Sequence, residues 1–84
     1  MYYNSEQEMS EPIILHWDRV IHKNVRSKDR IDIGNVISES GDTFTVMQGV
    51  SREYNFPKSA VEGFDGSELY ISIPFSEVQR YKVA

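Results

Sequence analysis

The chain has 84 residues, a formal net charge of −4 and no cysteine. Its length predicts a single domain, and the missing cysteine excludes disulfides, thiol catalysis and cysteine-ligated zinc. The acidic charge disfavours a general nucleic-acid binder, which needs a basic face to displace phosphate counterions. No apolar run approaches the ~20 residues that span a bilayer, and no signal-peptide pattern opens the chain. We therefore expect a cytoplasmic protein without a transmembrane segment.

The N-terminal residues differ from the rest of the chain in composition and in their lack of periodicity. Residues 1–12 are polar, acidic and aperiodic, which predicts a flexible tail before a folded domain over residues 13–84. The run Ile13–Trp17 predicts a first strand or an apolar arm. One turn is expected over Asp18–His22, followed by a strand near Lys23–Arg26.

A polar turn and a bent strand come next. The turn Ser27–Arg30 leads into alternating apolar residues, with Ile31 and Ile33 expected on one face. Val36 does not continue the alternation of Ile31 and Ile33, and Gly34 lies where the alternation shifts by one residue. Glycine permits the backbone geometry of a bulge, so we predict that the strand bends at Gly34.

Turn signals divide the remaining chain into further short elements. The sequence predicts a loop at Glu39–Asp42, a strand at Thr43–Gln48, a turn at Gln48–Ser51, a strand at Arg52–Phe56, a helical turn at Lys58–Val61 closed by Gly63, and a turn at Phe64–Ser67. Leu69, Ile71 and Ile73 form an inward-facing row. A short C-terminal helical turn is expected to cover one end, with Phe75, Val78 and Tyr81 three residues apart. Together these elements predict a small closed antiparallel β-barrel of five or six strands.

No residue pattern predicts catalysis, a cofactor or a metal. The possible metal ligands are His16, Asp18 and His22; Asp29 and Asp32; and Glu62, Asp65 and Glu68, none with the spacing of a known site. No nucleophile triad, phosphate loop or dinucleotide fingerprint is present. We expect no catalytic residue, no cofactor and no metal ligand.

Aromatic and basic residues predict a protein interface instead. Tyr70 lies opposite the inward row of its strand and should face outward. Exposed aromatics beside arginines are typical of protein–protein interfaces. The candidate partner contacts are Trp17, Arg19, Arg26, Arg30, Tyr70 and Tyr81.

Two other binding functions remain open at this point. A base could stack on Tyr54 with Arg52 and Lys58 beside it, as in an RNA- or ribosome-assembly-associated module. The acidic net charge makes nucleic acid the weaker interpretation. A barrel that binds a small ligand or a metal is the third.

Four segments stand out as a set: Trp17–Val25, Ser27–Val36, Phe56–Val61 and Leu69–Pro74. Together they resemble the PRC-barrel family, and most closely its short stand-alone archaeal members, over residues 17–82. One departure is Arg30, where the family commonly has glycine after the aspartate of the first turn. The resemblance implies a non-catalytic adaptor that docks to a larger machine through its barrel surface, as stand-alone archaeal members do in cell division. Self-association to a homodimer would add apolar burial that so small a domain lacks.

Overall fold

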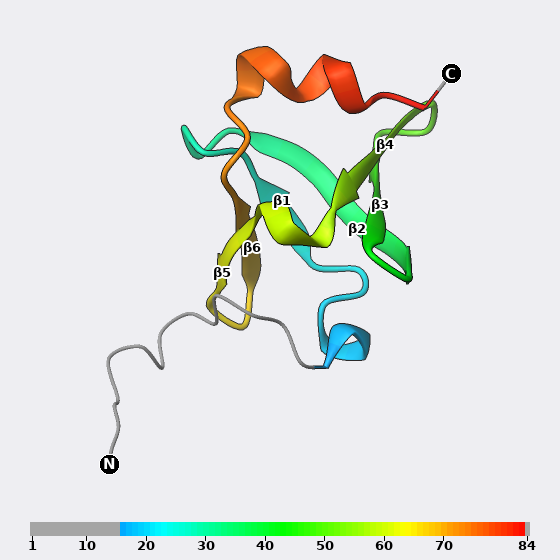
Figure 1. Cartoon of the computed structure of the whole chain (residues 1–84), viewed down its shortest axis with the longest axis vertical. Coiled ribbons are helices and arrows are strands. Elements are labelled where there is room, and N and C mark those ends of the chain that lie inside the picture. Colours follow the sequence, from blue (N-terminus) through cyan, green and yellow to red (C-terminus); the bar gives the residue numbers. More distant parts are fainter. Residues whose placement is uncertain (1–15, 84) are drawn as a thin grey trace.

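The computed structural model describes residues 16–83. In chain order its elements are η2 (Trp17–Arg19), β1 (Asn24–Arg26), β2 (Asp32–Ser40), β3 (Thr43–Gln48), β4 (Arg52–Pro57), η3 (Lys58–Ala60), β5 (Val61–Phe64), β6 (Glu68–Ile71) and η4 (Phe75–Tyr81). The η elements are 3₁₀ helices. Figure 1 shows a curved sheet with η4, in orange to red, lying across one end. The predicted tail over residues 1–12 and the first residues of the predicted strand or arm lie outside the described residues.

The six strands form one mixed sheet in the order β4-β3-β2-β1-β6-β5. Every neighbouring pair is antiparallel except β1 and β6, which run parallel. The number of strands is as predicted, but the prediction of an entirely antiparallel sheet is wrong. The outer strands β4 and β5 do not pair, so the closed barrel is not confirmed. The 3₁₀ helix η3, rather than a hairpin, joins β4 to β5, and β6 pairs with β1.

Alternating apolar residues build the core, as the sequence predicts. The buried hydrophobic residues are Val20, Val25, Ile33, Val36, Phe44, Val46, Tyr54, Phe56, Ala60, Phe64, Leu69, Ile71, Ile73 and Val78. Ile31 is an exception: it precedes β2 and is 40% exposed, so the prediction that it shares a face with Ile33 is wrong. β5 was also missed, because its residues were assigned to two turns.

Gly34 forms the predicted irregularity in β2. Its φ is +120°, and it is buried together with Ile33, the residue before it. The pairing of β1 with β2 shifts register at this point. A Cβ at Gly34 would lie 2.3 Å from the carbonyl oxygen of Met47 on β3. Only glycine therefore allows β2 to lie this close to β3.

The C-terminal segment covers the free edge of β4. Lys82 forms an isolated antiparallel bridge with Tyr54, and the Val83 N–H donates to the Glu53 carbonyl (2.8 Å). Tyr81 packs its ring 5.2 Å from that of Phe56. The helical turn predicted at this end is therefore confirmed, and its packing protects one edge of the sheet.

Candidate functional site

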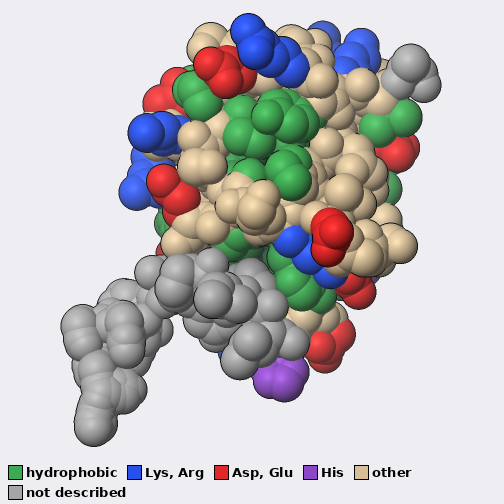
Figure 2. All heavy atoms as spheres, viewed as in Figure 1, with side chains coloured by type: hydrophobic (Ala, Val, Ile, Leu, Met, Phe, Trp, Pro, Cys, Tyr) green, Lys and Arg blue, Asp and Glu red, His purple; other side chains and the backbone are tan. Residues whose placement is uncertain are grey.

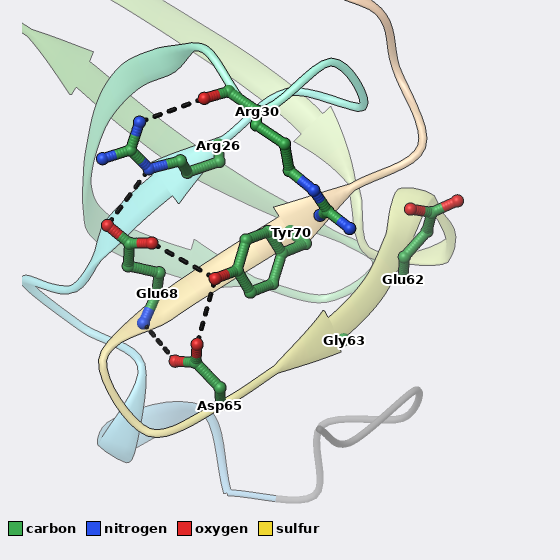
Figure 3. Close-up of a pocket in the computed structure, with 7 residues that line it drawn as sticks. All are labelled: Arg26, Arg30, Glu62, Gly63, Asp65, Glu68 and Tyr70. Atoms are coloured by element: carbon green, nitrogen blue, oxygen red, sulfur yellow. Dashed lines mark hydrogen bonds and ion pairs between the residues drawn. The ribbon is translucent and has the colours of Figure 1, made fainter. Parts of the chain in front are cut away.

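The outer face of the sheet carries an open hollow of about 650 Å³ beside β5 and β6. It is lined by Arg26, Arg30, Glu62, Gly63, Asp65, Glu68 and Tyr70, and Tyr70 stands at its centre (Figure 3). We call this surface the Tyr70 hollow. Its lining residues come from β1, β5, β6 and the turns that follow β1 and β5.

The turn after β1 positions Arg30. The Ser27 hydroxyl is buried, donates to the Asp29 carboxylate and accepts the Ile31 N–H (3.1 Å), while the Arg30 N–H donates to the Ser27 carbonyl (2.9 Å). These bonds hold Arg30 at a φ of +69°, in the left-handed region. The turn thus directs the Arg30 guanidinium over the ring of Tyr70, 4.5 Å from the ring centroid.

The turn between β5 and β6 fixes the hydroxyl group of Tyr70. The Tyr70 hydroxyl lies 3.0 Å from Asp65 Oδ2 and 3.2 Å from Glu68 Oε1. Its hydrogen bond to the Asp65 carboxylate raises the pKa of Tyr70. The backbone N–H groups of Glu68 and Ser67 donate to Asp65 Oδ1 and lower the pKa of that carboxyl group. Tyr70 is therefore a protonated, oriented side chain at neutral pH.

Arg26 completes the charge pattern of the hollow. Its Nε donates to Glu68 Oε2 (3.1 Å), and its Nη1 donates to the Arg30 carbonyl (3.0 Å), which ties β1 to the turn. Within residues 16–83, neither Arg30 nor Glu62 has an ionic partner in the hollow. Asp65 also lacks an ionic partner there, but backbone N–H groups and the Tyr70 hydroxyl hold its carboxylate. The site therefore presents one cation, Arg30, and two anions, Glu62 and Asp65, without an ion pair in the described residues.

The structure brings together three of the six predicted partner contacts, namely Arg26, Arg30 and Tyr70. Trp17 is half-buried, with its ring 5.0 Å from that of Phe44 in the core. Tyr81 is also half-buried against the core, and Arg19 is exposed on η2 and does not line the hollow.

Sequence reasoning did not include the acidic residues of the hollow among the partner contacts. Glu62, Asp65 and Glu68 were considered only as possible metal ligands, and Glu62 and Gly63 belong to β5, which was not predicted. Glu68 and Tyr70 share the outward face of one alternating strand, and that alternation was the available signal.

The structure also places the residues on which the two alternative binding functions depended. Tyr54 is 1% exposed, and its hydroxyl bonds to Gln48 and Gln79, so it has no free face on which a base could stack. Positive and negative side chains alternate around a group of hydrophobic side chains on the face drawn in Figure 2, which shows no continuous basic surface. No group of three or more His, Asp and Glu side chains in residues 16–83 could hold a metal ion.

Comparisons with protein families, with curated proteins and with solved structures found no match for this chain. No helix in the described part of the chain is long and apolar enough to cross a membrane.

Proposed function

We propose that the protein is a non-catalytic protein-binding adaptor and that the Tyr70 hollow is its partner-binding surface. The observation that carries the proposal is the arginine stacked on a tyrosine at the centre of an open hollow. Arginine and tyrosine are enriched among the residues that dominate binding energy at interfaces. The hydroxyl of Tyr70 is already held by Asp65 and Glu68, so the ring loses little freedom when a partner binds.

The PRC-barrel resemblance supports the same function and suggests a setting for it. A stand-alone member of that family would act as a scaffold, and an archaeal cell-division machinery is the setting we propose. Self-association to a homodimer is part of the proposal, because a domain of this size gains stability when it buries further apolar surface.

A pull-down of tagged full-length protein from extract of its own host, with and without nuclease, tests this function. We expect one or two proteins to be recovered whether or not nuclease is added. Tyr70→Ala and Arg30→Gln should reduce this recovery. Val50→Ser is the matched control, because Val50 is 99% exposed on a turn and lies outside the hollow.

The same experiment separates the adaptor from the other two functions. Ribosomal proteins that disappear with nuclease would favour the RNA- or ribosome-associated module, and this recovery should fall steeply with salt. A small-ligand or metal-binding barrel would instead show a higher melting temperature with one member of a metabolite and metal panel. Recovery that is unaffected by both hollow variants would contradict the Tyr70 hollow as the binding surface.

A further inference from the structure

The strand β5 forms an open edge of the sheet beside the Tyr70 hollow. β5 pairs with β6 on one side and, within residues 16–83, with no strand on the other. Two of its residues, Glu62 and Gly63, line the hollow. Gly63 has no side chain, so the backbone itself forms part of the lining. An extended peptide can add to such an edge through main-chain hydrogen bonds.

The register of β5 identifies the backbone groups that face this edge. The Asp65 N–H donates to the Glu68 carbonyl (3.2 Å), and Gly63 lies opposite Tyr70. In an antiparallel pair, residues that bond to the partner strand alternate with residues that do not. We therefore expect the N–H and carbonyl of Phe64, between these two pairs, to point toward the open edge while its side chain is in the core.

The charges of the hollow specify the chemistry of the occupant. Arg26 is paired with Glu68, whereas Arg30 contacts only the Tyr70 ring among the lining side chains. The guanidinium N–H groups of Arg30 are thus available to a carboxylate, which accepts them in a charge-assisted pair. Glu62 lies on β5, across the hollow from Arg26 (Figure 3). It favours a neutral or basic residue next to the acidic one.

The backbone conformation of Arg30 also indicates that its side chain has a function. A φ of +69° is strained for any residue except glycine, and asparagine tolerates it better than most. The chain nevertheless has arginine at this position. The turn requires this conformation but does not require an arginine, and the residue type at such a position is a reason to look for a function of the side chain.

We propose that the open edge of β5 binds an extended peptide of a protein partner and that an acidic side chain of this peptide pairs with Arg30. This inference rests on the proposed adaptor function and adds the conformation and the charge of the bound segment. The peptide backbone bonds to Phe64, and the peptide carboxylate lies against the guanidinium above the Tyr70 ring.

Selection from a display library of short linear random peptides, on immobilised full-length protein, tests the proposal. The best enriched peptide is then synthesised with its acidic residue and with the corresponding amide. Both peptides are titrated against wild type and Arg30→Gln. Glutamine, like arginine, is long and unbranched, so the backbone strain at this position is retained. Val50→Ser and the melting temperature of each variant serve as controls.

We expect the enriched peptides to share an acidic residue. Arg30→Gln and the amide peptide should each weaken binding by roughly tenfold or more, and the two changes together should weaken it no further. Glu62→Gln should strengthen binding of the acidic peptide by a few-fold, because it removes a like charge. Hydrogen exchange at the Phe64 amide should slow when the peptide is added.

Three results would contradict the inference, and each excludes a different part of it. If peptides bind in the hollow without an acidic preference, or independently of Arg30, the charge pairing is wrong and the adaptor function stands. If no peptide is enriched and the pull-down recovers no protein partner, the adaptor function fails as well. Peptides that bind but leave Phe64 exchange unchanged would contradict the edge-strand geometry.

Discussion

The two outer strands of the sheet end it in different ways. β4 has six residues, and the C-terminal segment covers its edge through Lys82 and Val83. β5 has four residues and a register shift, and no described strand lies beyond it. Only the three residues of η3 separate the two strands in the chain. One edge is thus closed by the protein's own C-terminal segment, and residues 16–83 leave the other open beside a charged hollow.

This difference shows how a small sheet can leave one edge exposed and still limit which strands pair with it. A long unpaired edge invites aggregation, and proteins limit this risk with short strands, bulges and charges. β5 has all three features, because it is short, shifts register and carries Glu62. Only a strand that complements the charges of the hollow is expected to gain from pairing there.

The largest effect is expected at Gly34, which allows β2 to connect the two halves of the sheet. Gly34→Ala would place a Cβ 2.3 Å from a backbone oxygen at a φ of +120°. We expect it to lower the free energy of unfolding by at least about 3 kcal/mol, measured by urea denaturation. Gly41→Ala is the control. It also has a positive φ but no atom within 4 Å, so it should cost only about 1 kcal/mol. Equal costs for the two variants would contradict the close approach of β2 and β3.

The next effect tests the closed edge. Removing residues 82–84 deletes the hydrogen bond from Val83 to Glu53 and the bridge to Tyr54. We expect a loss of about 1–2 kcal/mol of unfolding free energy, because each net hydrogen bond contributes about 0.5–1.5 kcal/mol. The newly open β4 edge should also promote association, which sedimentation velocity would detect as a concentration-dependent species. A truncated protein that remains as stable as the full chain and does not associate further would show that the edge needs no cover.

Two tyrosines, one near each edge, are expected to differ in how much their hydroxyl groups stabilise the fold, and both effects are smaller than the preceding ones. Tyr54→Phe leaves Gln48 and Gln79 without their buried partner and should cost about 1 kcal/mol or more. Tyr70→Phe removes a half-exposed hydroxyl between Asp65 and Glu68 and should cost at most about 0.5 kcal/mol. Thermal unfolding of both variants measures the difference. The reverse order would contradict the account, because it would mean that the Tyr70 hydroxyl contributes more to stability than the buried Tyr54 hydroxyl.

The smallest expected effect is a dependence of stability on acid pH. Hydrogen bonds from the Ser27 hydroxyl and the Phe75 N–H lower the pKa of Asp29, and those from Glu68 and Ser67 lower that of Asp65. A lowered folded-state pKa means that each carboxylate stabilises the protein above its ordinary pKa of 3.8. That stability should be lost as the pH falls through the folded-state pKa.

Two asparagine variants separate these contributions. Asp29→Asn and Asp65→Asn should each flatten the decline in unfolding free energy below the ordinary carboxyl pKa of 3.8. Asp29 joins the first turn to η4, whereas Asp65 belongs to the β5–β6 turn, so the two changes should add. A pH profile identical to wild type in both variants would contradict the hydrogen bonds at these carboxylates.

The sequence predicted the local elements better than their arrangement. Alternation placed Leu69, Ile71 and Ile73 in the core and Tyr70 on the opposite face, because side chains alternate along a strand. The bend at Gly34 was predicted because the alternation of apolar residues shifts there. β5 was missed because Gly63 and the adjacent turn residues mask a strand of four residues. The parallel pairing of β1 with β6 joins residues far apart in the chain, and no local pattern encodes it.

The candidate site was predictable to the same extent. Arg30 and Tyr70 were identified from residue type and alternation, but their contact depends on the pairing of β1 with β6. The position of Glu62 in the hollow depends on β5. Such a site is assembled by long-range register, which a single sequence does not reveal.

Site-specific photo-crosslinking at the two edges shows which of them contacts the partner. A benzophenone side chain replaces Glu62 on β5 in one full-length variant and Arg52 on β4 in another, both exposed positions, and each is irradiated in host cells. We expect a defined, nuclease-resistant protein adduct from position 62, absent from position 52 and lost when Arg30→Gln is added. The same adduct from position 52, or an adduct that survives Arg30→Gln, would contradict the open edge of β5 and the Tyr70 hollow as the partner-binding surface.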